Sequence, residues 1–201
     1  MICVTGHPEL FECFLDEWAC IDNFSLAVLV DTKDEHVLGL AVAWNVTDAY
    51  FVSFQDCSSE SGGDEDQKKH EGQKKMGAQR CGNVENVIER VKAVFTRRQS
   101  SPSDSARTII CYHSRSVMKG LHRIGIAARG NFIDLSVANW LINPDSPIPK
   151  DVASLAAMFL QSLELKSFLP RAKLSAEGDG EREACFEAVL CWGTSKPLLK
   201  R

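Results

Sequence analysis

The stretch that decides the fold is FSLAVLVDTKDEHVLGLAVAWNVTDAYFVSF, residues 24–54. It contains three short runs rich in β-branched and aromatic residues, with polar turn residues at 33–35 and 45–48 between them: Phe24–Asp31, Val37–Trp44 and Ala49–Phe54. Runs of this length and composition between turn signals predict a β-meander. Because the first run is almost entirely apolar, we expect it to be a central strand of a sheet that is covered by helices on both faces.

The composition indicates one intracellular globular domain. The chain has 201 residues, of which 44% are hydrophobic, enough for one core. Its net charge of −4 excludes the globally basic surface of autonomous nucleic-acid binders, so any DNA contact must be local. Its eight cysteines form no CxxC pair, which favours reduced core thiols. It has no secretory leader and no apolar run near the ~20 residues that a bilayer requires, so we expect a soluble protein without a membrane partner.

The segments beside the meander differ sharply in composition. Apolar residues recur at helical spacing over Pro8–Cys20, which predicts an amphipathic helix that docks on the sheet. Residues 56–82 have a mixed charge run and almost no large apolar side chain, so burial cannot offset the entropy of ordering them. We expect a disordered insertion there, either a solvated surface loop or a flexible arm for a partner or for DNA.

The second half of the chain alternates helices with short strands. The expected elements are a helix that starts at the N-cap Asn83, a strand Arg107–Tyr112, a helix Ser114–Ile124 closed by Gly125, a strand Phe132–Asp134 that runs into a helix Leu135–Ile142, and helices Asp151–Leu163 and Glu181–Trp192. The four tryptophans fall in apolar elements, which favours packing. This order predicts one α/β domain over residues 1–192, with a mixed sheet of the ribonuclease H-like kind, and a tail over 193–201.

Five strings in this order carry a resemblance to a known family. They are FSLAVLV (24–30), LGLAVAW (38–44), DAYFVSFQ (48–55), IICYHSRSVMKGLHRIGI (109–126) and NWLINPDSPIP (139–149). Together they resemble the 3′–5′ exonuclease-like domain of family A DNA polymerases. The resemblance runs roughly from Cys3 to Trp192 and is interrupted by the expected insertion.

The resemblance implies a ribonuclease H-like domain in front of a DNA-directed DNA polymerase domain. It further implies a nuclear protein in the repair of double-strand breaks by end joining, with Mg²⁺ needed only by the polymerase domain. After Trp192 the chain has only GTSKPLLKR, so we expect a fragment or a truncated product. Two alternatives stay open, namely an active metal-dependent 3′–5′ exonuclease and a free-standing adaptor that binds a protein partner.

The family's metal-binding pattern is missing from this sequence. Proofreading exonucleases use two divalent metals about 4 Å apart, which carboxylate oxygens must hold. The family pattern is Asp-x-Glu on the first strand, an Asp early in the helix after the fourth strand, and Tyr-x-x-x-Asp on the last helix. Aligned on that pattern, the chain has Leu29 and Asp31 on the strand, Val117 on the helix, and Arg182 and Phe186 at the last two positions. We therefore expect no metal site and no nuclease activity in this chain.

Two other groups of residues are candidate sites. Arg115, Lys119 and Arg123 repeat every four residues on one helix face, which indicates either a weak phosphate-contacting stripe or the solvated side of an amphipathic helix. Cys111 and His113 lie two residues apart at a strand end and could act as nucleophile and base, but a core thiol beside a strand-end histidine is the simpler interpretation.

Overall fold

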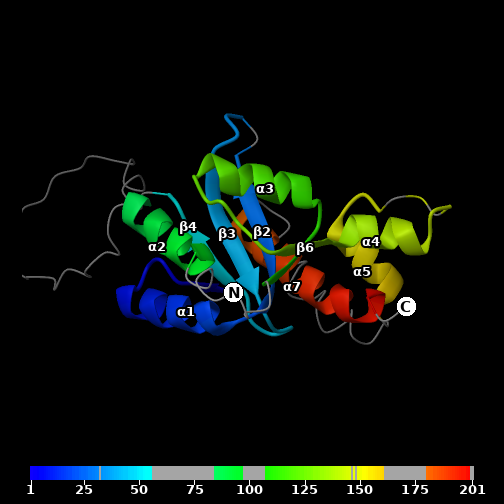
Figure 1. Ribbon diagram of the computed structural model, residues 1–201, viewed down its shortest axis with the longest axis horizontal. Helices are drawn as coiled ribbons and strands as arrows, with labels where there is room; N and C mark the ends of the chain where they lie inside the picture. Colours follow the sequence, from blue (N-terminus) through cyan, green and yellow to red (C-terminus); the bar gives the residue numbers. More distant parts are fainter. Residues whose placement is uncertain are drawn as a thin grey trace, which may run out of the picture.

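The meander forms the middle of a mixed six-stranded sheet in the computed structural model (Figure 1). The structure describes residues 1–31, 33–55, 84–96, 107–145, 147, 149–160 and 180–199. The strand order is β1 (Ile2–Cys3), β4 (Tyr50–Ser53), β3 (Val37–Ala43), β2 (Asn23–Val30), β5 (Thr108–Cys111), β6 (Asn131–Asp134). The strands β2, β3 and β4 pair antiparallel, whereas β5 and β6 add in parallel beside β2. The predicted α/β class and the central position of β2 are thereby confirmed.

The strand β2 presents its two faces to different helices. Phe24 and Leu26 belong to a core cluster with α1 (Pro8–Cys20), α2 (Val84–Thr96) and α3 (Ser114–Arg123). Ala27 and Leu29 belong to a second cluster with α7 (Gly180–Leu198). Alternate residues of a strand point to opposite faces of the sheet, so every second residue of β2 belongs to the same layer.

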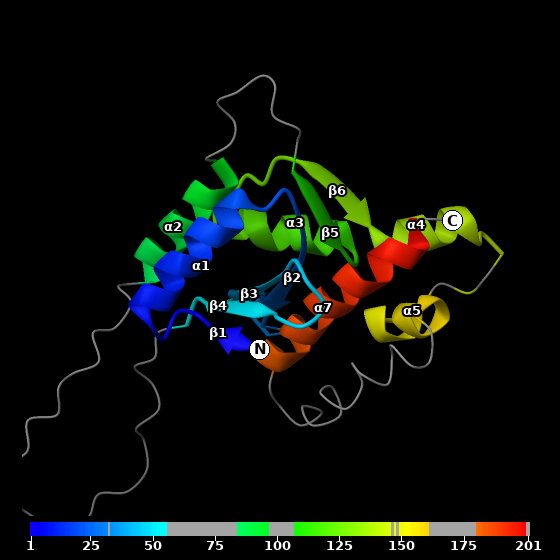
Figure 2. The same cartoon turned by 90° about the horizontal axis from the view of Figure 1, so that it is seen from below.

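Three helices gather at the end of the sheet that β6 borders. The helices α4 (Leu135–Ile142) and α5 (Val152–Phe159) pack with α7 in a third cluster, which also takes in Ile110 and Tyr112 (Figure 2). Asp134 and Asp151 are the N-caps of α4 and α5, and each accepts a hydrogen bond from a serine N–H of its helix. None of the helices in the described ranges is long and apolar enough to cross a membrane.

The structure changes four details of the expected organisation. The short strand β1 pairs in parallel with β4 and was not predicted. The helix α7 continues past Trp192 to Leu198, and Thr194, Ser195 and Leu198 are buried, so part of the expected tail belongs to the core. Trp140 is 51% exposed, although we expected it to pack inside. The helix expected over Asp151–Leu163 is described as Val152–Phe159. The predicted insertion 56–82 and the N-cap Asn83 lie outside the described residues.

Candidate functional site

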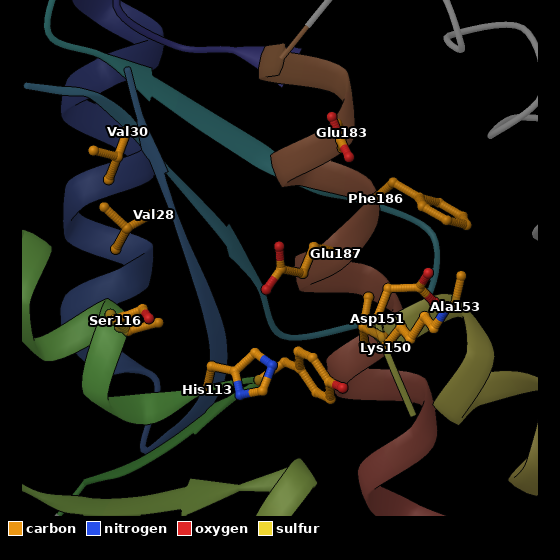
Figure 3. A pocket seen from close by; sticks show the side chains of 13 residues that line it. Val28, Val30, His113, Ser116, Lys150, Asp151, Ala153, Glu183, Phe186 and Glu187 are labelled. Carbon is orange, nitrogen blue, oxygen red and sulfur yellow. The ribbon is translucent and has the colours of Figure 1, made fainter. Parts of the chain in front are cut away.

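A cleft of about 460 Å³ opens beside the second half of β2 (Figure 3). The parallel pairing of β2 with β5 covers only Asn23–Ser25, so the rest of β2 runs on beyond the end of β5. The helices α3 and α7 both pack against β2, and side chains from β2, α3, α7 and the segment before α5 line the cleft. Side chains from the strand, the helix and the last helix of the predicted metal-binding pattern meet in this cleft.

The strand contributes Val28 and Val30 to this cleft, not the residues that the sequence alignment selected. Leu29 points to the opposite face, where its Cδ1 lies 3.0 Å from the position that a Cβ on Gly180 would take. Asp31 follows the end of the strand, and its carboxylate accepts a hydrogen bond of 2.8 Å from the Lys33 N–H. Leu29 therefore faces away from the cleft, because neighbouring residues of a strand point to opposite faces of the sheet. Asp31 stabilises a turn and does not line the cleft.

The second wall comes from α3 and carries no acid. Val117, which the alignment set at the helix position of the metal-binding pattern, is buried and lines the cleft. Ser116 and His113 lie beside it, and the His113 ring stands 4.2 Å from the Tyr112 ring, centroid to centroid. The Tyr112 hydroxyl donates a hydrogen bond of 2.6 Å to the Pro149 carbonyl, which fixes the segment that leads into α5.

The third wall comes from α7 and holds two carboxyl groups. Phe186, which the alignment set at the last position of the pattern, lines the cleft, and Glu183 and Glu187 line it as well. Figure 3 shows Glu187 on the side of Val28 and His113. Burial, together with the charge of Glu183, raises the pKa of Glu187 to about 7. The sequence analysis missed both residues. The buried stripe Ala184, Ala188, Cys191 could have revealed Glu187, because position 187 is three residues from 184 and four from 191.

The cleft has few other groups that could hold a metal ion. Asp151 lines it, but its carboxylate accepts a hydrogen bond of 2.6 Å from the Ser154 N–H, and the hydrogen bonds from Ser154 keep its pKa below the usual value. Within the described part of the chain, no three His, Cys, Asp or Glu side chains come together in an arrangement that could bind a metal.

The basic stripe of α3 is engaged within the protein. Glu35, in the turn between β2 and β3, forms ion pairs with Lys119, at 3.4 Å, and with Arg123. The Arg123 guanidinium also donates a hydrogen bond of 2.9 Å to the Glu35 carbonyl oxygen. Arg115 has no ion pair with any residue that the structure describes. Two of the three predicted cations thus hold a turn, and none of the three lines the cleft.

Cys111 is a core thiol and not a nucleophile. Its side chain is fully buried, with the sulfur 3.9 Å from the Ile133 carbonyl oxygen. Burial, with a smaller contribution from Asp134, raises the pKa of the thiol to about 12. Because the thiolate is the reactive form, this environment suppresses the reactivity of Cys111.

The fold is that of an exonuclease-like domain of the ribonuclease H-like kind. The structure matches the Aedes aegypti Nibbler EXO domain with a TM-score of 0.55 and 12% identity, over 99% of this chain and 87% of that chain. It also matches the POL domain of Pol1 from M. smegmatis, solved with DNA primer-template and dNTP, with a TM-score of 0.54 and 15% identity over 98% of this chain and 28% of that chain.

The particular relative found by sequence is DNA polymerase theta from Mus musculus. The identity is 28% and the match covers 98% of this chain, which confirms the resemblance predicted from the sequence. The chain spans only 9% of the length of that relative. No family model matches the chain.

Proposed function

We propose that this chain is a catalytically inactive exonuclease-like domain of a DNA polymerase theta-like protein, and that it supports a polymerase domain in the same polypeptide. The observation that carries the proposal is the composition of the cleft. Val28, Val30 and Val117 line it from β2 and α3, the two elements from which the proofreading pattern takes three of its acids.

Aliphatic side chains at these positions oppose metal-dependent hydrolysis. Two hard cations need several converging oxygen ligands, and a valine supplies none. The carboxyls of Glu183 and Glu187 both come from α7, so they approach a ligand from one side only. With a pKa of about 7, Glu187 is partly protonated at neutral pH, which further weakens it as a ligand.

The proposal assigns the polymerase chemistry to another part of the same polypeptide. In this proposal, Mg²⁺ binds the polymerase domain, and the protein acts in the nucleus in the repair of double-strand breaks by end joining. The contribution of this chain to DNA binding is weak, because Glu35 already pairs with Lys119 and Arg123. The similarity of nearly the whole chain to a short part of a DNA polymerase theta supports this assignment.

The test is degradation of a 5′-labelled single strand by the purified chain with Mg²⁺ or Mn²⁺. We expect no loss of 3′ nucleotides from the natural chain. Cleavage that is abolished by Glu187→Gln but unaffected by Asp31→Ala would contradict the proposal, because it would show a metal site rebuilt around α7. Asp31→Ala is the matched control, since it also removes one carboxylate, from a turn outside the cleft.

A further inference from the structure

The outward face of α4 is apolar. Val137, Trp140 and Leu141 are 50%, 51% and 68% exposed, and they stand at positions i, i+3 and i+4 of the helix. Pro144, which follows the C-cap Asn143 just beyond the helix, is exposed too. Positions i, i+3 and i+4 share one face of a helix, so Val137, Trp140 and Leu141 form a continuous apolar surface. Together with Pro144 it is here named the α4 surface. Contiguous exposed apolar surface of this kind marks an interaction site more often than scattered single side chains do.

The inward face of α4 strengthens this interpretation. Leu135 and Asn139 are the buried residues of the helix, and the Asn139 side-chain oxygen has no hydrogen-bond partner among the described residues. If α4 only covered the core of this domain, the opposite arrangement would be more stable, with the Asn139 amide in water and the Trp140 ring buried. The largest apolar side chains of α4 are therefore placed for a neighbour outside the described fold.

The end of α7 lies beside α4. The two helices are in contact, and Figures 1 and 2 both place the C-terminal end of α7 next to α4. Leu199, which follows the end of α7, is 51% exposed. The chain corresponds to 9% of the mouse DNA polymerase theta sequence and to 28% of the M. smegmatis Pol1 chain, so in both relatives most of the polypeptide lies outside this domain.

From these observations we infer that the α4 surface, Val137, Trp140, Leu141 and Pro144, is the docking surface for a polymerase domain carried on the same polypeptide. The inference rests on the proposed function and adds to it the place of contact. No lysine or arginine lies within α4, so the contact is apolar and its strength depends little on salt. This weak dependence on salt distinguishes the contact from one with DNA, whose affinity falls steeply as the salt concentration rises.

The experiment is a calorimetric titration of the full 201-residue chain with the polymerase domain of mouse DNA polymerase theta as probe, at 50 and 300 mM salt. We expect saturable one-to-one binding that varies little with salt and that Leu141→Glu weakens at least about tenfold, because a charge replaces the most exposed contact of an apolar surface. Met118→Glu on α3, at a methionine that is 43% exposed, is the matched control and should bind like the natural chain.

Three outcomes would overturn the inference: no binding, binding that Leu141→Glu and Met118→Glu affect equally, or a concentration-dependent dimer of the chain alone that Leu141→Glu abolishes. Sedimentation velocity of the chain by itself tests the last outcome. Circular dichroism melts of both variants show that each is folded, which we expect because both substituted side chains are exposed. The nuclease assay described above is independent of this titration, so a failure of the docking surface and a failure of the catalytically silent assignment are distinguishable.

Discussion

The helices α3 and α4 have similar positions in the chain but opposite outward faces. Each follows a strand of the parallel part of the sheet, α3 after β5 and α4 after β6. The outward face of α3 carries Lys119 and Arg123, which pair with Glu35, whereas that of α4 carries Trp140 and Leu141. An amphipathic helix that covers only its own sheet has a polar outer face. The difference therefore indicates that α3 completes this domain, while α4 is also shaped for a second neighbour.

One carboxylate, that of Asp134, binds the N-terminal ends of both helices, so its removal should have the largest effect on stability. The Asp134 carboxylate accepts hydrogen bonds from the Ser136 N–H, 2.9 Å, at the start of α4 and from the Ser114 N–H, 2.7 Å, at the start of α3. Although burial alone raises the pKa of a carboxyl group, the hydrogen bonds from Ser136 and Ser114 hold the pKa of Asp134 below its usual value. We expect Asp134→Ala to lower the free energy of unfolding by about 2–4 kcal/mol in urea titrations at pH 7.

The control for this prediction is Asp151→Ala. Asp151 caps α5 alone, through the Ser154 N–H, so its loss should cost about 1 kcal/mol. Because the pKa of Asp134 is depressed in the folded state, its contribution is present above the unfolded pKa of about 3.9 and is lost as pH falls through the lower folded value. Equal losses for the two variants would show that Asp134 does not hold both helices.

A second prediction concerns the inward face of α3. A Cβ on Gly120 would lie 2.7 Å from Val28 Cγ1, so Gly120→Ala forces α3 away from β2. We expect a loss of about 1–3 kcal/mol in the free energy of unfolding. The control is Gly193→Ala in α7, where a Cβ meets nothing within 4 Å, and this variant should gain up to about 1 kcal/mol from helix propensity. Two variants of equal stability would contradict the close approach of α3 to β2.

The pH dependence of stability tests the cleft that α3 and α7 enclose. The folded pKa of Glu187, about 7, lies above its unfolded value, so the folded state binds the proton more tightly. The stabilisation that protonated Glu187 contributes is therefore fully present below about pH 4.3, and it is lost as the pH rises through about 7. We expect Glu187→Gln to stabilise the protein by about 1–2 kcal/mol at pH 8 and to have little effect at pH 4, in thermal melts across this range. An equal effect at both pH values would show that Glu187 is not desolvated.

Most of the fold follows from local patterns in the sequence. The helix Pro8–Cys20 and the helix Leu135–Ile142 have the predicted bounds, because apolar spacing, Pro8 at the start of one and Asn143-Pro144 after the other define them locally. The strand β1 could not be predicted in this way. It has two residues, both exposed, and exists only through its pairing with Tyr50 and Phe51. The last part of α7 lacked an apolar pattern, since its buried residues include Thr194 and Ser195.

The cleft could be predicted only in part. Val117 and Phe186, which the alignment set at two positions of the metal-binding pattern, both line the cleft, and helical spacing predicted that Val117 faces inward. On β2 no such pattern was available, since residues on both faces of the strand are buried and the apolar run does not alternate. Nothing in FSLAVLV distinguishes the face of Val28 from that of Leu29. Which residues face the cleft is decided by the helices that pack on each side of β2. The exposed face of α4 was missed because an apolar helix was taken to be a buried one.

The smallest expected effect on stability separates the two interpretations of the α3 stripe. Glu35→Gln removes the negative charge that Lys119 and Arg123 pair with, which should change the free energy of unfolding by less than about 1 kcal/mol because the ion pairs are exposed. If the stripe contacts phosphate, two released cations add about 1.4 to the slope of log affinity against log salt for a single strand. Fluorescence anisotropy with a labelled oligothymidine measures this slope. Glu12→Gln is the matched control, because it breaks an ion pair with Arg90 away from α3. A slope that becomes steeper only in Glu35→Gln indicates a phosphate-binding stripe whose cations are neutralised by Glu35 in the natural chain. Equal slopes in both variants indicate that these cations serve only to fix the turn between β2 and β3.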